Sequence, residues 1–225
     1  MTSITCRIPL YDGAIRKLSR WMLLAGFFFI VTLAAAELDT PTPEQSPLAL
    51  VQKTSEEVLG LLQSRKGDFK NNPYPVCKLV DAAVARQFDF ESMSKWVLGK
   101  YWRNASEQQR RDFEKEYREL LVRTYSTALL EYAGYSVSFR PVHVPKESNK
   151  VIVRTQLALQ GGNSVSVHYR LHRVGDGWKV YDLLIDGVSI VTTYRRTFAN
   201  NIEIQGLDAL IQRLADRNST LRRGL

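Results

Sequence analysis

Cysteine is scarce in this chain: Cys6 and Cys77 are the two cysteines among 225 residues. This excludes a small scaffold held by several disulfides, and the absence of a CxxC motif or Cys/His cluster excludes a structural zinc site. The chain also has no P-loop, dinucleotide-binding glycine fingerprint, HExxH or GxSxG motif. The sequence therefore lacks the signatures of the common nucleotide-binding, zinc-peptidase and serine-hydrolase sites.

Long hydrophobic runs are also few, and the main one extends from Trp21 to Leu33. It is shorter than the ~20 apolar residues that a transmembrane helix needs. Arg16, Lys17 and Arg20 precede it, and a run of three alanines ending at Ala36 follows it. A basic segment, a short apolar segment and small residues in this order predict a secretory signal peptide over residues 1–36, cleaved after Ala36.

Removal of residues 1–36 changes the charge and the cysteine count. It takes away four basic side chains and one acidic side chain, which lowers the formal net charge from +8 to +5. Cys77 then remains alone, and we expect a small buried side chain without an internal disulfide. The remaining basic residues are spread among acidic ones, and no RRM or helix-turn-helix pattern occurs. No nucleic-acid partner is therefore predicted.

With 44% apolar and 24% charged residues, the chain has the composition of a globular protein. Residues 37–47 are proline-rich and predict a flexible lead-in, residues 48–215 a folded domain, and residues 216–225 a basic tail. Hydrophobic periodicity and capping residues predict helices in the first half of the domain, over 47–65, 79–88, 90–98 and 107–132. Pro73 and Pro75 predict a turn between the first two helices.

After Gly134 the hydrophobic period changes from that of a helix to that of a strand. Four strands are predicted, over 135–142, 151–159, 165–173 and 178–186, followed by helices over 188–202 and 207–214. Glycine-rich turns at 161–163 and 175–177 indicate hairpins, so the sheet is expected to be antiparallel. The predicted fold class is α+β: a twisted four-stranded antiparallel sheet with helices packed on one face around an apolar cavity. Such a cone-like fold resembles nuclear-transport-factor-2-like domains.

Candidate catalytic and metal-binding groups are few. His168 and His172 lie four residues apart on one predicted strand, about 13 Å apart, which is too far to share a metal ion. No metal or cofactor site is therefore predicted. Asp182 and Asp186 have the same spacing on another strand, too far apart for a glycosidase pair. An alternative function is that of an exported cone-fold isomerase or hydrolase. In such an enzyme one of these carboxylates, beside a tyrosine, would act as the base.

Short motifs along the chain resemble the MlaC family, also called toluene-tolerance auxiliary proteins. The similar segments cover roughly residues 48–215, and it is their joint order and spacing that makes the resemblance specific. They comprise residues 88–91, 97–103, 108–113, 121–125, 178–182, 187–191, 194–195 and 206–211.

The resemblance implies a soluble, monomeric periplasmic carrier rather than an enzyme. Such a carrier would hold the acyl chains of a glycerophospholipid in a hydrophobic cavity. It would shuttle lipid between an outer-membrane lipoprotein–porin complex and an inner-membrane ABC transporter with an MCE-domain subunit, which maintains the lipid asymmetry of the outer membrane. Beyond this transported phospholipid, no cofactor is implied.

The inward strand face and the neighbouring helices are the expected cavity wall. From the strands we expect Val137, Phe139, Val153, Leu157, Val165, Val167, Tyr169, Val180 and Leu184 to contact lipid, and from the helices Val97, Leu98, Tyr101, Tyr125, Leu129, Val188, Val191, Tyr194 and Phe198. A protein-binding adaptor, in which these side chains close into a solid core, is a further alternative. The presence of a cavity separates the carrier from the adaptor, and a carboxylate inside it would favour the enzyme.

Overall fold

The computed structural model describes residues 46–71, 73–131, 136–145, 147–158 and 163–222. Every described residue belongs to one compact unit. The predicted signal peptide, residues 37–45 of the lead-in and residues 223–225 of the predicted tail lie outside the described residues. Among the residues described, no helix has the length and apolarity to cross a membrane.

Five helices occupy the first part of the described chain, and their starts follow local signals. Ser46 caps the first helix through a 3.0 Å bond from the Ala49 N–H, and Asp89 caps the fourth through a 2.9 Å bond from the Ser92 N–H. Both caps satisfy backbone donors that a helix leaves free at its start. The helices are α1 (Pro47–Ser64), α2 (Lys66–Asn71), α3 (Pro73–Val84), α4 (Phe90–Leu98) and α5 (Lys100–Asn104).

Two details of this region differ from the sequence expectation. Pro73 and Pro75 lie in the first turn of α3 rather than in a turn between helices. The first turn tolerates proline because its N–H groups have no partner within the helix. The short helix α2 was also not expected, since Gly67 was interpreted as the end of α1.

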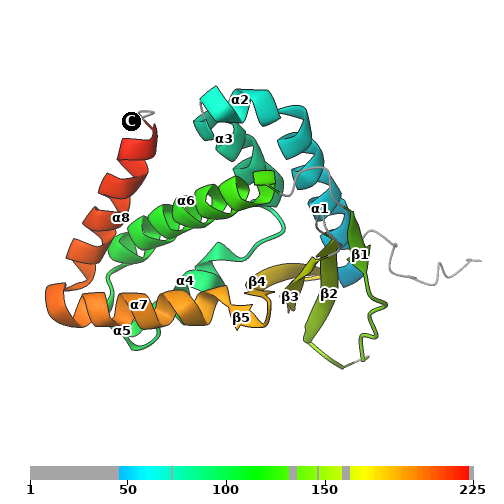
Figure 1. Ribbon diagram of the computed structural model, residues 1–225. Helices are drawn as coiled ribbons and strands as arrows, with labels where there is room; N and C mark the ends of the chain where they lie inside the picture. The colour runs from blue at the N-terminus through cyan, green and yellow to red at the C-terminus, as the bar shows by residue number, and fades with distance from the viewer. Residues whose placement is uncertain (1–45, 72, 132–135, 146, 159–162, 223–225) are drawn as a thin grey trace, which may run out of the picture. The chain divides into compact units, whose positions relative to one another are not determined.

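Three further helices make up the rest of the described helical part: α6 (Glu107–Glu131), α7 (Ile190–Gln205) and α8 (Leu207–Arg222). The predicted capping box begins α6, since Ser106 Oγ accepts from the Gln109 N–H at 3.1 Å and Gln109 Oε1 accepts from the Ser106 N–H at 2.9 Å. Helices α3 and α8, far apart in sequence, both pack against α6 (Figure 1).

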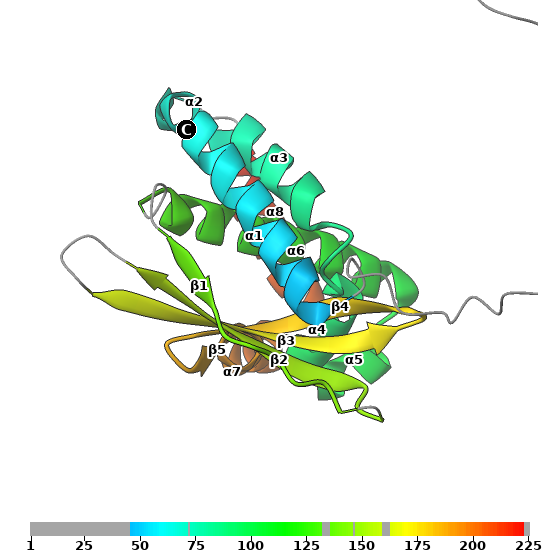
Figure 2. The same ribbon diagram turned by 90° about the vertical axis from the view of Figure 1, so that its right-hand side faces the viewer.

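The predicted antiparallel sheet is confirmed, with strand order β1-β2-β3-β4-β5. Its strands are β1 (Val137–Phe139), β2 (Lys150–Ala158), β3 (Ser164–Val174), β4 (Gly177–Ile185) and β5 (Val188–Ser189). The two-residue β5 was expected as the start of a helix, and α7 begins just after it. Helices α1, α3 and α6 lie on one side of the sheet (Figure 2).

A β-bulge in β4 changes which side chains face these helices. The β3–β4 register shifts between Arg170 and Leu171, so Leu171 pairs with Val180 whereas Arg170 pairs with Asp182. The extra residue, Tyr181, displaces the two-residue alternation by one position. Beyond the bulge the inward residues of β4 are therefore odd-numbered, and the even-numbered residues turn to the opposite face.

Apolar side chains form three buried clusters. The largest joins α4, α6, α7 and α8 around Phe113, Tyr117 and Phe198, whose rings stack or meet edge to face. A second cluster packs α1 against α3 and includes Cys77, which is buried as expected. The third lies between the start of α1 and the sheet, around Val153, Leu171 and Val180.

The predicted boundary after residue 215 falls inside a helix. Helix α8 continues to Arg222 instead of ending at Leu214, and the side chain of Asn218 is fully buried. The segment expected to be a basic tail therefore packs on the domain as far as Arg222.

Candidate functional site

An apolar cleft of about 170 Å³ lies between the helices and the inward face of the sheet. Helices α1 and α3 supply one wall, β1 to β4 the other, and α4 and α6 lie between them. The cleft is lined by Thr54, Ser55, Val58, Leu59, Val80, Val84, Phe88, Phe90, Met93, Leu121, Val122, Tyr125, Ser126, Val137, Thr155, Leu157, Val167, Tyr169, Leu183, Ile185 and Ile190. None of these side chains is ionised at neutral pH.

The polar atoms around the cleft are hydroxyl groups. Thr54 donates to the Leu50 carbonyl and Thr155 to the Val167 carbonyl, each at 2.7 Å, so both hydroxyls are used by the backbone. The Ser55 and Tyr169 hydroxyls lie 3.4 Å apart. Burial raises the pKa of Tyr169, and it raises the pKa of Tyr125 to about 12. The phenols therefore stay neutral, and the cleft is suited to an uncharged, largely apolar ligand.

Several of the predicted lipid-contact residues meet at this cleft. Val137, Leu157, Val167 and Tyr169 line it from the sheet, and Tyr125 lines it from α6. These positions were predicted because they alternate along strands or recur along a helix, and that local periodicity holds here. Val165 lies on the same face of β3, directly opposite Leu157 in the register, but it is not part of the lining.

The structure places most of the other predicted residues in the solid core or at the surface. Val97, Leu98, Tyr101, Val191, Tyr194 and Phe198 belong to or pack on the cluster between α4, α6, α7 and α8, and Phe139, Val153 and Val180 belong to or pack on the cluster beneath α1. Val188 is exposed on β5. The side chain of Leu129 lies outside the described residues. Alternation identified an inward face, but it did not indicate where along that face the helices fill the space.

Leu184 is a correction to the expected wall. It pairs with His168, whereas its neighbours Leu183 and Ile185 pair with Tyr169 and Val167, which line the cleft. Leu184 therefore faces away from the cleft. Every second residue counted from Val180 includes Leu184, and the sequence contains no signal for the bulge.

Helix α1 supplies wall residues that the prediction omitted. Ser55, Val58 and Leu59 line the cleft from this helix. Their spacing already indicated an apolar helix face, but the sequence did not show that this face lies opposite the sheet. Phe88 and Phe90, on either side of the Asp89 cap, were missed for the same reason.

The carboxylates of the alternative enzyme lie elsewhere. Asp182 is 2% exposed, and its oxygens accept from Ser189 Oγ at 2.7 Å, the Val191 N–H at 3.2 Å and Arg170 Nη1 at 3.2 Å. This carboxylate holds the start of α7. Asp186 is exposed and accepts from the Ser166 N–H at 2.9 Å. Neither lines the cleft, and the described residues contain no cluster of metal-ligating side chains.

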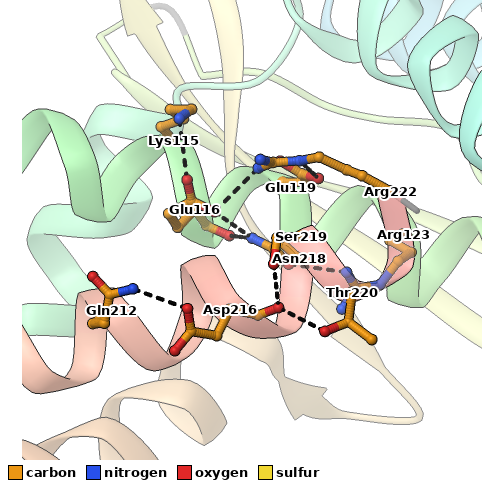
Figure 3. Close-up of polar contacts among 10 residues, drawn as sticks. All are labelled: Lys115, Glu116, Glu119, Arg123, Gln212, Asp216, Asn218, Ser219, Thr220 and Arg222. Carbon is orange, nitrogen blue, oxygen red and sulfur yellow. Dashed lines mark hydrogen bonds and ion pairs between the residues drawn. The ribbon is translucent and has the colours of Figure 1, made fainter. Parts of the chain in front are cut away.

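A second hollow, of about 470 Å³, lies between α3, α6 and α8 and is lined by charged side chains. Its charges pair with one another, as in Arg118, whose guanidinium donates to both Asp81 oxygens at 2.6 and 2.8 Å. Figure 3 shows Asn218 and Arg222 of α8 directed at Glu116 and Glu119 of α6. Charged groups at this density disfavour acyl chains, so the apolar cleft is the candidate lipid site.

Comparison with known proteins identifies the family of the chain. The family model described as MlaC protein matches residues 52–216. The chain belongs to the MlaC family. Among curated MlaC-like relatives, the toluene tolerance protein ttg2D of Pseudomonas putida is 29% identical over 180 residues, covering 80% of this chain and 83% of the relative. The intermembrane phospholipid transport system binding protein MlaC of Haemophilus influenzae is 24% identical over 201 residues, covering 88% and 92%.

A solved structure has a similar fold. The phospholipid-binding protein of Ralstonia solanacearum, determined in complex with a phospholipid, matches with a TM-score of 0.70 and 29% sequence identity. The match covers 77% of this chain and 97% of that protein. The family membership inferred from short motifs is thus confirmed over nearly the whole described domain.

Proposed function

We propose that this protein is a periplasmic carrier that holds the acyl chains of a glycerophospholipid in the cleft between α1, α3 and the sheet. The observation that carries the proposal is the cleft itself: its wall combines aliphatic and aromatic side chains with neutral hydroxyl groups. Two relatives, the intermembrane phospholipid transport system binding protein MlaC and the phospholipid-binding protein of Ralstonia solanacearum, support the same ligand class.

The physical need for such a carrier follows from the hydrophobic effect. Exposing an acyl chain to water costs ~0.8 kcal/mol per CH₂, on the order of 13 kcal/mol for a 16-carbon chain. A protein that crosses an aqueous compartment with the chains in an apolar cleft avoids most of that cost. The proposed carrier would exchange lipid with an outer-membrane lipoprotein–porin complex and with an inner-membrane ABC transporter that has an MCE-domain subunit, and it acts without catalysis.

The volume of the cleft adds a condition to the proposal. About 170 Å³ is less than the ~300–1,000 Å³ of typical small-molecule sites, and a phospholipid is a large ligand. The wall formed by α1 and α3 is held by side-chain packing, whereas the other wall is a hydrogen-bonded sheet. Lipid entry therefore requires the helix pair to move away from the sheet.

Native mass spectrometry of the exported protein, purified from a bacterial periplasm without detergent, tests the proposal. We expect adducts at phospholipid masses, identified after organic extraction. Val167→Trp should abolish the adducts by filling the cleft, whereas Val174→Trp, at the exposed end of the same strand, should retain them. A wild-type protein that carries no lipid, or full occupancy in Val167→Trp, would overturn the proposal.

A further inference from the structure

The side of the sheet that faces away from the cleft carries a row of basic side chains from neighbouring segments. Arg140 follows β1, and its N–H donates to the Arg154 carbonyl at 3.0 Å, so these residues are cross-strand neighbours. Arg154 in turn lies directly opposite His168. Since Thr155 and Val167, their neighbours along the strands, face the cleft, Arg154 and His168 face the other way, and Arg140 and Arg154 form a cationic row beside the imidazole of His168.

The two arginines of the cationic row are exposed and form no ion pair within the described part of the chain. Two other basic groups on this face have carboxylate partners: Arg170 lies 3.2 Å from Asp182, and His172 lies 2.8 Å from Asp89. Like charges directly opposite each other across strands are destabilising. The two opposed arginines therefore cost some stability, and no described carboxylate pairs with them, so they are open to an anion from outside.

The electrostatic effect of the row is visible at His168. Burial lowers the pKa of this imidazole, and Arg154 and Arg140 lower it further. A positive potential that disfavours a proton on His168 attracts an anion to the same place.

An exposed aromatic corner lies on the same face of the sheet. Trp96 of α4 is 49% exposed, and its ring lies 6.5 Å from that of Tyr181, the bulge residue of β4. Lys150 Nζ lies 5.9 Å from the Trp96 ring centroid and 6.0 Å from that of Tyr181. Tryptophan and tyrosine beside basic residues are the combination that favours the interface between a bilayer and water.

We propose that this sheet face docks onto the anionic surface of a phospholipid bilayer, with the cationic row on lipid phosphates and Trp96 at the interface. Neither of the two described cavities is lined by these residues, whereas recognition of a peptide normally uses a groove or a free strand edge. The contact goes beyond the carrier function, because the cleft lies on the other side of the sheet.

The test is co-sedimentation of the exported protein with vesicles of phosphatidylcholine and phosphatidylglycerol, compared with phosphatidylcholine alone. Binding should require the anionic lipid and should weaken with salt, since the Debye length falls from ~10 Å at 0.1 M to ~3 Å at 1 M. Each arginine near an anionic surface contributes roughly fivefold in partitioning, so Arg140→Gln/Arg154→Gln should reduce binding by about 30-fold. Trp96→Ala should reduce it as well.

The matched control is Arg196→Gln/Arg213→Gln, which removes the same charge from exposed positions of α7 and α8. This control should change partitioning by less than about twofold. Equal losses in the two double variants, or no binding of the wild type, would overturn the proposal. Equally strong binding to soluble poly-glutamate would also overturn it, in favour of an acidic protein surface. Lipid occupancy of each variant, measured by native mass spectrometry, reports separately on the carrier function.

Discussion

The side-chain amide of Asn218 on α8 donates to Glu116 on α6 twice, to the backbone carbonyl at 3.0 Å and to Oε2 at 2.7 Å. Its own oxygen accepts from Arg123 Nη1 at 3.0 Å. Asn218 has no exposed surface, and Glu116 is buried as well. Figure 3 shows the two side chains directed at each other. This contact attaches the C-terminal half of α8 to the domain.

Asn218→Ala should therefore lower the free energy of unfolding by about 2–3 kcal/mol, because it leaves a buried carboxylate and a buried carbonyl short of a donor. Denaturant unfolding measures the loss. Gln212→Ala is the matched control on the same helix, since it removes an exposed bond to Asp216 and should cost no more than about 0.5 kcal/mol. If Asn218→Ala lowered the free energy of unfolding by no more than Gln212→Ala does, the end of α8 would be a dispensable tail.

The bulge in β4 predicts opposite effects at two adjacent leucines. Leu183→Trp should fill the cleft and reduce the co-purified lipid, while Leu184→Trp should keep lipid at the wild-type level, because its side chain faces away. Native mass spectrometry gives the occupancy, and circular dichroism checks that both variants fold. Equal occupancy in the two variants would mean that the face assignment beyond Tyr181 is incorrect.

Substitutions at Asp182 and Asp186 should affect the stability of the fold to different degrees, and neither should affect lipid binding. Asp182→Asn weakens buried bonds to Arg170, Ser189 and the start of α7, so it should cost about 2–3 kcal/mol of unfolding free energy. Asp186→Asn should cost less than about 1 kcal/mol, because its site is exposed and asparagine tolerates the positive φ of 46° found there. Both variants should retain lipid, and loss of lipid with unchanged stability in Asp182→Asn would contradict a structural role.

Cys77 should react slowly with thiol reagents. Burial raises the pKa of its thiol to about 11, so the nucleophilic thiolate is rare at pH 8. We expect alkylation of the folded protein, followed by mass spectrometry of the Cys77 peptide, to be far slower than alkylation in denaturant. Because the unfolded thiol ionises at lower pH than the folded one, this group stabilises the fold below its unfolded pKa, and that contribution is lost as pH rises toward 11. Rapid labelling of the native protein would contradict the buried position.

Local signals predicted much of the helical part. Ser46, Asp89 and Ser106 cap the helices that they were expected to begin, because a cap bonds only to N–H groups two or three residues away. The alternation of Val165, Val167, Tyr169 and Leu171 likewise predicted one inward strand face, since this pattern depends on neighbouring residues alone.

The candidate site was predictable only in part. Val137, Leu157 and Val167 were found because they alternate, and Tyr125 because it recurs on the apolar face of α6. Val58 and Leu59 of α1 were missed as wall residues, although their helix was expected. Nothing within that helix shows which strands it will lie opposite, because the contact joins residues about a hundred positions apart.

By itself, the sequence determined the α+β class, the antiparallel order of the strands and the MlaC family. These three properties depend on short-range periodicity, turn residues and motif spacing, which can be observed in the sequence of a single segment or in the order of segments. The tertiary structure alone decided that Leu183 rather than Leu184 faces the cleft, that Asn218 is buried against Glu116, and that Arg140 lies beside Arg154. Each of these depends on register or packing between distant segments, and a sequence pattern describes only one segment at a time.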